Sequence, residues 1–515
     1  MCGFFASNDP TITKDSEDII NSRLAFRGPD GQSGMVFHKD WKLYHSRLSI
    51  IAPVEKFSQP FFSKTGNVLV FNGEILNFRE LSIKYNIDQT DSDTEALNEL
   101  LSIDGFDINE LEGFFAFARF NRQGDITHCA RDRFGVKPLY FHKRGDYISI
   151  SSEASALSDL FKLDYEESAL EEYKVFRAPV FSGSYFKDIQ TVEPGTCLIS
   201  GTFFDCKSYF TNNYINESEV SNKIHNTILD SLKSRLISDV PVGLLYSGGI
   251  DSNLLNEVCE EKLQKFTGGF SGDYDLELAR NNNNSNNDNT ILVEVSREKF
   301  KKRFFEMTKL RKEPLSVPNE VILSFLAERW ANMGGKVLIS GEAADEFFGG
   351  YDRIYGWALR AENFEIDKFL EFYCYVPLDK IPDRIVKEVN DFFEPLQSMS
   401  PFEMVRYFFV KKHLPILFRR LDFSLMFSGI EGREPLASLN MFLLALKCNP
   451  NDLFKGALGK LPLRNLAKEL ISEEFAFSTK VGFPVDLGLI FREVPSKDKY
   501  ENYQVWYDEN IGAIV

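Results

Sequence analysis

The second residue of the chain is a cysteine, and its position gives it an unusual chemical option. Cys2 and Gly3 are small enough for Met1 to be removed, which would leave Cys2 at the mature amino terminus. An α-amino group has a pKa of about 8, so it could take the proton of the thiol on the same residue and generate a thiolate nucleophile. The alternative is that position 2 is an ordinary residue near a frayed chain end.

Short polar clusters in the first 100 residues supply further groups for such chemistry. Each cluster on its own fits turn chemistry, and we expect them at strand ends or turns. Together with Cys2 they offer an amide and a backbone N–H for an oxyanion (Asn72, Gly73), a cation for a carboxylate (Arg47) and an anion for an ammonium (Asp93). This set suits a free amino acid with a side-chain amide.

A glycine- and serine-rich segment in the second half follows a short apolar run. The segment SGGIDS (247–252) lies between the apolar run VGLLY and a predicted helix. Its glycines let the backbone approach a ligand, and a helix N-terminus favours an anion, so the pattern predicts a phosphate site. Asp251 fits that site if Mg²⁺ accompanies the phosphates. The alternative is a Ser/Gly turn that only opens a helix.

A second segment places three carboxylates in a tight turn. SGEAADEFFGGY (340–351) carries Glu342, Asp345 and Glu346 after another apolar run. In a doubly wound sheet this turn lies at the carboxyl edge, where ligands bind, so the carboxylates are placed to hold magnesium or move protons. A solvated acidic loop is the alternative.

The elements that must position these groups divide the chain in two. Up to residue 205, short alternating or apolar runs predict a β-rich domain with a few helices. The polar, amide-rich segment 206–218 is the predicted linker. From 219 to 515 a predicted amphipathic helix is followed by apolar runs that alternate with helical stretches, a pattern typical of a parallel sheet covered on both faces. Beyond about residue 355 the pattern is mainly helical.

The asparagine-rich run at 281–289 stands apart from these elements. Asparagine favours turns and cannot fill a core, so we expect a flexible loop there.

The amino-acid composition limits the kinds of partner that we expect this chain to bind. The 515 residues carry a formal net charge of −17, which repels phosphate backbones and argues against nucleic acid. No apolar stretch is long enough to span a bilayer and no leader pattern opens the chain, so we expect no membrane association and a cytoplasmic location. The seven scattered cysteines and six scattered histidines predict neither a disulfide framework nor a zinc or histidine metal site.

The motifs, taken in order, resemble those of the glutamine-dependent asparagine synthetases, which are amidotransferases with an N-terminal cysteine nucleophile. The resemblance covers nearly the whole chain. It rests on MCGFF, FRGPDG, HSRLSII, SQPF, FNGEILN, SDTE, GFFAFA and RDRFGVKPLYF in the first half, and on PVGLLYSGGIDS, ISGEAADEFFGGY, GIEGREP and STKVGF in the second.

This resemblance implies a fold and an activity. The N-terminal part would be an α+β glutaminase domain of the N-terminal nucleophile type, an antiparallel β sandwich with helices. The C-terminal part would be an α/β ATP-pyrophosphatase domain with a parallel sheet and a helical end. The chain would use ATP and Mg²⁺ to convert a carboxylate, with aspartate the first choice, into an acyl-adenylate that ammonia from glutamine attacks.

It also implies roles for individual residues. Cys2 would attack the glutamine amide, Asn72 and Gly73 would hold the oxyanion, and Arg47 and Asp93 would bind the substrate with help from Glu74. Glu342 would lie beside the activated carboxylate. The residues implied for ATP, pyrophosphate and magnesium, with Asp251 and Asp345 as the metal ligands, are Leu245, Ser247, Gly248, Gly249, Asp251, Ser252, Ser340, Gly341, Asp345 and Lys480. The segment RDRFGVKPLY would lie near the interdomain surface.

Three segments depart from the family pattern near the expected acceptor pocket. Ala343 replaces the glycine of GEGADE, the R-x-P-F-L-D element reads REPLAS and so lacks its final acid at Ser438, and the segment before the box at 422–426 reads LPIL. A different acceptor, such as a sugar uronic acid or a secondary metabolite, is therefore an alternative. A non-catalytic nucleotide or amino-acid sensor is a second one, and the sequence leaves a homodimer open.

Overall fold

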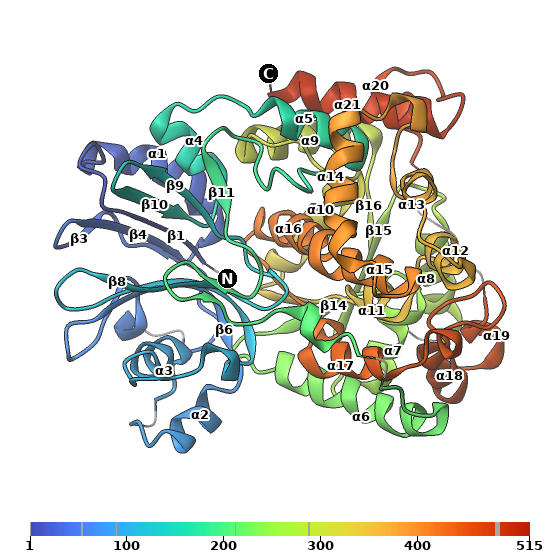
Figure 1. The fold of residues 1–515 in the computed structure, drawn as a ribbon, viewed down its shortest axis with the longest axis horizontal. Helices are drawn as coiled ribbons and strands as arrows, with labels where there is room; N and C mark the ends of the chain where they lie inside the picture. The colour runs from blue at the N-terminus through green and yellow to red at the C-terminus, as the bar shows by residue number, and fades with distance from the viewer. Residues whose placement is uncertain are drawn as a thin grey trace.

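The computed structural model describes residues 2–52, 55–88, 90–211, 213–286, 289–478 and 485–514. An N-terminal lobe contains two antiparallel sheets, and a C-terminal lobe contains a parallel sheet with many helices (Figure 1). The predicted α+β and α/β fold classes are confirmed. None of the helices within the described ranges combines the length and the apolar content that crossing a bilayer requires.

The first sheet of the N-terminal lobe holds β1, the strand that begins directly after Cys2. Its order is β11-β9-β10-β1-β4-β2, with β3 paired to β4, and these pairs are antiparallel. The strands are β1 (Gly3–Ser7), β2 (Gly31–Gln32), β3 (Val36–His38), β4 (Trp41–Arg47), β9 (Tyr140–Arg144), β10 (Tyr147–Ser151) and β11 (Ile189–Thr191).

The second sheet packs against the first and carries Asn72. Its antiparallel order is β13-β12-β8-β7-β6-β5. The strands are β5 (Phe61–Phe62), β6 (Val68–Ile75), β7 (Gly113–Phe120), β8 (Ile126–Arg131), β12 (Thr196–Cys197) and β13 (Gly201–Thr202).

Side-chain alternation explains why these sheets form a sandwich between helices. Successive residues of a strand point to opposite faces, so Phe4 of β1 packs with Val70 of β6 in the core between the sheets. Phe5 points the other way and joins the cluster under the first sheet's helices, while Phe71 joins the cluster under the second sheet's helices. The helices of this lobe are α1 (Glu17–Leu24), α2 (Phe78–Lys84), α3 (Asp93–Leu100), α4 (Ala154–Phe161) and α5 (Glu167–Phe176).

The C-terminal sheet is parallel, with the order β16-β15-β14-β17-β18. Its strands are β14 (Val242–Leu245), β15 (Gln264–Gly269), β16 (Ile291–Glu294), β17 (Val337–Ile339) and β18 (Glu431–Arg433). The chain leaves β14 toward β15 on one side and later returns to β17 on the other side. Ligands bind at such a switch point, outside the carboxyl ends of the strands.

Helices cover both faces of this sheet. Leu244 and Ile339 pack toward Ile228 of α6, whereas Leu338 packs toward Leu326 of α10 and Leu425 of α16. The helices of the lobe are α6 (Glu217–Arg235), α7 (Ile250–Val258), α8 (Tyr274–Asn286), α9 (Arg297–Arg311), α10 (Asn319–Ala331), α11 (Ala344–Phe348), α12 (Asp352–Arg360), α13 (Ile366–Tyr373), α14 (Asp383–Phe393), α15 (Pro401–Phe408), α16 (Leu414–Met426), α17 (Leu439–Lys447), α18 (Leu461–Leu470), α19 (Glu473–Ala476), α20 (Leu487–Phe491) and α21 (Lys499–Ile514).

The prediction of a loop at the asparagine run was wrong for its first part. Residues 281–286 form the end of α8. The Asn283 side chain explains how a polar run is held in place, because its amide exchanges two hydrogen bonds with the backbone of Thr290, at 2.8 and 3.1 Å, just before β16. Residues 287–288 lie outside the described ranges.

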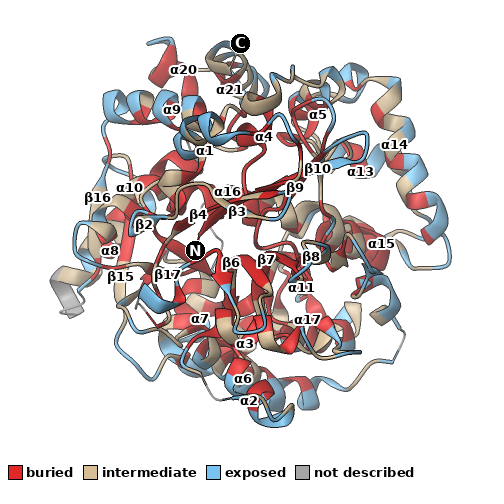
Figure 2. Cartoon of the chain, turned by 90° about the vertical axis from the view of Figure 1, so that its left-hand side faces the viewer, coloured by how far each residue is buried: buried red, intermediate tan, exposed pale blue. Residues whose placement is uncertain are grey.

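The two lobes share a buried boundary, and the strands β6 and β7 of the lobe that faces the viewer in Figure 2 are mainly buried. Phe134, from the segment RDRFGVKPLY, packs on Phe347 and Phe442 of the C-terminal lobe with ring centroids 5.5 Å apart in each pair. At the other end of the boundary, α21 returns to the N-terminal lobe, where Tyr507 stacks on Tyr173. The proposed division at 206–218 stays a prediction.

Candidate active site

Cys2 and Asn72 meet where the two sheets of the N-terminal lobe face each other. The backbone N–H of Cys2 donates to Asn72 Oδ1 at 3.0 Å. The Nδ2 atom of Asn72 is buried and has no hydrogen-bond partner among the described residues. A buried amide donor without a partner, beside a thiol, is placed to stabilise a developing oxyanion.

The thiol itself is almost fully enclosed. Cys2 is 8% exposed, and its Sγ lies 3.8 Å from the carbonyl oxygen of Leu48. Burial raises the pKa of this thiol, because a thiolate is poorly solvated there. The thiol therefore needs a nearby base, and the α-amino group that Met1 removal would expose on Cys2 is one.

Gly73 is required by the close approach of β6 and β7. Its φ is +143°, and a Cβ atom at this position would lie 2.0 Å from the carbonyl oxygen of Phe114. The prediction that Asn72, Gly73 and Glu74 lie at a strand end or turn was wrong, because all three are inside β6 and pair with β7. Glycine adopts this conformation without strain, so β6 stays paired with β7 directly after Asn72.

Glu74 and Asp93 form a buried acidic pair in the same region. Asp93 begins α3, and its Oδ2 accepts a hydrogen bond from the backbone N–H of Ile75 at 3.0 Å. Burial raises the pKa of Asp93 to about 6, and burial together with the neighbouring Asp93 raises the pKa of Glu74 well above its usual value. A ligand cation here would restore full ionisation, which suits the ammonium group of an amino acid.

Arg47 ends β4 and is only partly buried. Its guanidinium donates to the carbonyl oxygen of Ala52 at 3.1 Å and to Ser58 Oγ at 3.2 Å. Gly28 packs directly behind it, since a Cβ there would lie 2.2 Å from the backbone nitrogen of Arg47. The glycine of the FRGPDG motif therefore allows the turn before β2 to pack against the end of β4.

In the C-terminal lobe, the loops after β14 and β17 lie side by side because the two strands pair, Leu244 opposite Ile339. A Cβ on Gly341 would lie 2.9 Å from Cβ of Asp251, so the glycine permits the contact between the loops. In the first loop, Gly248 has a φ of +68°. Ser252 holds the loop closed, since its Oγ accepts from the Ser247 backbone N–H at 3.3 Å.

These loops border a cavity of about 400 Å³. Of the residues predicted for the ATP site, those lining the cavity are Ser247, Gly248, Gly249, Asp251 and Asp345. The other described ones lie next to these in the chain: Leu245, Ser252, Ser340 and Gly341. Glu342, predicted to lie beside the activated carboxylate, follows Gly341. Lys480 belongs to 479–484, outside the described residues, and Ser478 borders the cavity just before that segment.

The sequence reasoning missed a buried lysine in this cavity. Lys460 Nζ lies 2.8 Å from Asp251 Oδ2 and 2.8 Å from Asp345 Oδ1. Although burial opposes it, the two carboxylates raise the pKa of Lys460 above its usual value. A fixed cation between two acids is suited to phosphate oxygens. No local pattern marked Lys460 as a site residue, because the carboxylates that it pairs with lie more than 100 positions earlier in the chain.

The donor set also fits a magnesium ion. Asp251 Oδ1 is buried without a hydrogen-bond partner among the described residues, and carboxylate oxygens plus phosphates are the usual Mg²⁺ ligands. No three His, Cys, Asp or Glu side chains in the described ranges converge into a complete protein cage. A metal here would therefore take part of its ligands from nucleotide phosphates.

Glu342 pairs with an arginine and is not among the residues that line the cavity. Its Oε1 lies 3.5 Å from a guanidinium nitrogen of Arg420 in α16. The next residue, Ala343, has a φ of +82° and is completely buried. Only glycine adopts this conformation without strain, so the alanine that departs from GEGADE keeps the turn at an energetic cost.

Buried ion pairs that the sequence did not predict link the Cys2 site to the C-terminal lobe. Arg27 Nε donates to the carbonyl oxygen of Cys2 at 3.1 Å. Its Nη1 lies 2.6 Å from Glu153 and 2.7 Å from Asp422 of α16 in the other lobe. Lys137 of the RDRFGVKPLY segment is also buried there, 3.8 Å from Asp422.

Two protein-family models match this chain, one in its N-terminal part and one in its C-terminal part. The glutamine amidotransferase domain model matches residues 1–210, and the asparagine synthase model matches residues 223–503. The chain belongs to the asparagine synthase family. The resemblance stated from the motifs is thereby confirmed.

Curated relatives carry the same family name. Asparagine synthetase [glutamine-hydrolyzing] 1 of Bacillus subtilis strain 168 is 27% identical over 557 residues, covering 95% of this chain and 87% of that protein. Putative asparagine synthetase [glutamine-hydrolyzing] 2 of Methanocaldococcus jannaschii is 27% identical, covering 66% of this chain and 73% of that protein. The asparagine synthetase of Asparagus officinalis is 28% identical, with 68% and 60% covered.

One departure of this sequence from the family pattern has a local structural explanation. The family acid is replaced by Ser438, which is the N-cap of α17 and accepts a hydrogen bond from the Met441 backbone N–H at 3.2 Å. Serine and aspartate are both strong N-cap residues. The replacement therefore preserves the local structure that an aspartate would supply.

Proposed function

We propose that this chain is a glutamine-hydrolysing asparagine synthetase, which uses ATP to convert aspartate to asparagine and releases AMP, pyrophosphate and glutamate. The observation that carries the proposal is the contact of Cys2 with Asn72, which leaves the Asn72 Nδ2 donor without a partner beside the thiol. The family match and the curated relatives support aspartate as the acceptor.

In the N-terminal site, after loss of Met1, the Cys2 amine takes the thiol proton and the sulfur attacks the glutamine side-chain amide. Asn72 Nδ2 and the Gly73 backbone N–H stabilise the oxyanion, while Arg47 binds the substrate carboxylate and Asp93 binds its ammonium with Glu74. Collapse of the tetrahedral adduct expels ammonia and leaves a thioester on Cys2, which water hydrolyses to glutamate.

In the C-terminal site, the 247–252 loop and Lys460 bind the ATP phosphates. The aspartate side-chain carboxylate attacks the α-phosphorus, forming an acyl-adenylate and releasing pyrophosphate. Asp251 and Asp345 would hold Mg²⁺, which neutralises the leaving pyrophosphate, and Lys480 would add a further positive charge. Ammonia then displaces AMP, with Glu342 beside the reacting carbonyl to accept a proton.

Ammonia must pass between the sites without becoming ammonium. Ammonium has no lone pair and is the major form in neutral water, so an enclosed route preserves the nucleophile. We propose that this route crosses the buried boundary between residues 1–205 and 219–515. Cytoplasmic location fits the substrates, and all seven cysteines are free thiols, as a reducing compartment favours.

The first experiment supplies ATP, Mg²⁺, glutamine and aspartate to the purified full chain. We expect asparagine, pyrophosphate and glutamate in equal amounts. Pyrophosphate without asparagine would favour another acceptor, and a panel of amino acids and uronic acids would then identify it. A Cys2→Ala protein that keeps ammonia-driven synthesis and loses glutamine-driven synthesis would exclude the sensor alternative.

A further inference from the structure

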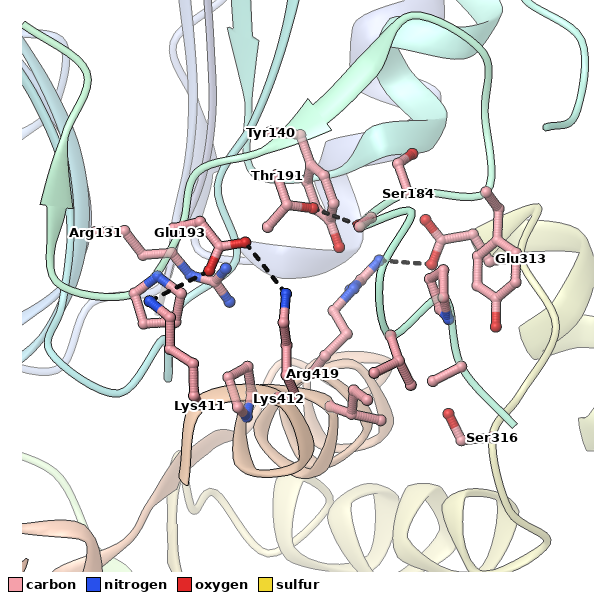
Figure 3. A pocket seen from close by; sticks show the side chains of 18 of the residues that line it. Arg131, Tyr140, Ser184, Thr191, Glu193, Glu313, Ser316, Lys411, Lys412 and Arg419 are labelled. Atoms are coloured by element: carbon pink, nitrogen blue, oxygen red, sulfur yellow. Dashed lines mark hydrogen bonds and ion pairs between the residues drawn. The ribbon is translucent and has the colours of Figure 1, made fainter. Parts of the chain in front are cut away.

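A separate pocket lies between the two lobes, away from both reaction sites (Figure 3). It has a volume of about 100 Å³, enough for several water-sized groups. The N-terminal lobe contributes the walls around Tyr140 and 178–194, and the C-terminal lobe contributes 311–316 and 411–419. None of the residues assigned above to glutamine or ATP lines it.

The pocket is cationic in a chain that is strongly acidic overall. Its lining includes two carboxylates, Glu193 and Glu313, and five cations, which are Arg131, Arg311, Lys411, Lys412 and Arg419. On one side Lys411 and Lys412 share Glu193, at 3.4 and 3.8 Å, so two ammonium groups have one counter-charge between them.

Arg131 adds positive charge on the same side. Its guanidinium donates to three backbone carbonyl oxygens, those of Gly135, Lys137 and Val192, and forms no ion pair within the described ranges. Arg131 is 4% exposed. The Glu193 side chain, in contrast, is 52% exposed, so it can move into solvent and leave the lysines to a ligand.

Two polar groups in the pocket lack a hydrogen-bond partner among the described residues. The Tyr140 residue is 6% exposed, and its hydroxyl forms no hydrogen bond with the described residues. Figure 3 shows Tyr140 pointing from the upper wall toward the side where Lys412 and Arg419 lie. Arg419 Nε is likewise buried without a partner in the described part of the chain. Such donors, among cations, are arranged for oxyanion oxygens.

A chain of ion pairs runs from this pocket to the nucleophile. Arg419 lies 2.8 Å from Glu153, Glu153 lies 2.6 Å from Arg27, and Arg27 donates to the Cys2 carbonyl oxygen. Arg419 also lies 3.2 Å from Glu313. An anion that draws Arg419 into the pocket would weaken its hold on Glu153 and so alter the position of Arg27 behind Cys2.

We propose that this interdomain pocket is a regulatory site for a small oxyanion, a phosphate or a dicarboxylate, whose binding alters glutamine hydrolysis through Arg419, Glu153 and Arg27. The ligand is held by Lys411, Lys412 and Arg131, with Tyr140 donating its hydroxyl proton. It displaces Glu193 toward solvent and takes no part in the chemistry at either reaction site.

The test titrates the full chain with inorganic phosphate and, separately, with malonate, using calorimetry, and measures glutamate release from glutamine at each concentration. The pocket variant is Lys411→Gln/Lys412→Gln, and the matched control is Lys380→Gln/Lys387→Gln on exposed positions. We expect at least one anion to bind wild type and control about tenfold more tightly than the pocket variant, since charge-assisted hydrogen bonds are lost. Tyr140→Phe should weaken binding without changing the fold.

The bound anion should change kcat/KM for glutamine in wild type and control, and not in the pocket variant. A response to phosphate alone would identify phosphorylated ligands, and a response to malonate alone would identify dicarboxylates. Any of three results would overturn the proposal. An anion could bind the pocket variant as tightly as the wild type, neither phosphate nor malonate could bind the wild type, or a bound anion could leave kcat/KM for glutamine unchanged. If the wild type hydrolyses no glutamine, the proposed function fails, and calorimetry still decides whether the site exists.

Discussion

At the scale of single residues, the most informative feature is the buried acidic pair Glu74 and Asp93. Neither carboxyl has a cation in direct contact within the described residues. Burial is the main cause of both raised pKa values, and repulsion by Asp93 further raises the pKa of Glu74. A substrate ammonium would relieve both effects at once. The pair titrates as a unit, so its protonation should govern glutamine binding.

The KM for glutamine should therefore rise as the pH falls through about 6, because protonation of Asp93 removes the anion that binds the ammonium. Asp93→Asn should raise KM by about tenfold or more, the size of a lost charge-assisted hydrogen bond, and should flatten the pH profile. Asp91→Asn, two positions earlier and exposed, is the control. A wild-type KM that is constant from pH 8 to about pH 5 would contradict this assignment.

The same raised pKa has a consequence for stability with a definite sign. The folded state holds the Asp93 proton more tightly than the unfolded chain does, so this group stabilises the fold at acid pH. That contribution disappears as the pH rises from 3.8, the ordinary pKa of an aspartate, through the raised pKa of about 6. Asp93→Asn should remove this pH dependence.

Ala343 offers a second test at residue scale. Left-handed backbone costs alanine about 1–2 kcal/mol, whereas the loss of a buried methyl group costs about 0.8 kcal/mol. Ala343→Gly should therefore unfold at the same urea concentration as wild type or a higher one. Ala344→Gly, buried in the first turn of α11, should lose about 1 kcal/mol or more. Equal losses in the two variants would show that Ala343 is not strained.

At the scale of elements, the two parallel strands β14 and β17 bring the phosphate loop and the carboxylate loop together. Helix α17 follows β18, and its N-cap is Ser438, at the position of the final acid in the R-x-P-F-L-D pattern. The cap, rather than a negative charge, is what the fold uses at this position.

Ser438→Asp should therefore keep both stability and synthetase activity, because aspartate caps a helix as well as serine does. Ser438→Ala should lower the free energy of unfolding by about 1 kcal/mol. Urea denaturation and the rate of pyrophosphate release measure the two effects. If Ser438→Asp gained or lost the ability to use aspartate, position 438 would belong to the acceptor pocket.

The elements also show how far the sequence could predict the structure. The apolar runs at 242–246, 265–270, 290–295 and 336–340 gave four strands correctly, because a buried parallel strand is nearly continuous in apolar residues. Strand β18 was missed because Glu431, Gly432 and Arg433 have no apolar side chain. It forms by parallel pairing with β17, and its two charged side chains can be buried because the Arg433 guanidinium lies 2.6 Å from Glu431.

In the candidate site, sequence motifs identified only residues that belong to short, continuous segments of the chain. Cys2, Asn72 and the two loops of the C-terminal lobe follow from short patterns. Lys460 and the pair of Arg27 with Asp422 do not, since each depends on a contact between residues that lie far apart in the sequence. The Lys460 contacts form only when the C-terminal lobe folds, and the pair of Arg27 with Asp422 forms only when the two lobes pack together.

At the scale of the whole molecule, the lobe that hydrolyses glutamine and the lobe that uses ATP meet at one buried boundary. Phe134 packs on aromatic residues of the other lobe, while Arg27 links the Cys2 carbonyl to Asp422. A rigid boundary of this kind can keep the two sites in a fixed relation. The route that we propose for ammonia crosses this boundary.

The most direct measurement uses glutamine labelled with ¹⁵N in its side-chain amide, together with ATP, Mg²⁺, aspartate and an excess of unlabelled ammonium in the buffer. Transfer across the boundary predicts that the asparagine formed during glutamine-supported turnover retains the ¹⁵N label. Cys2→Ala should form only unlabelled asparagine under the same conditions. Wild-type product whose label is diluted to the isotopic composition of the buffer would contradict a direct transfer between the two lobes.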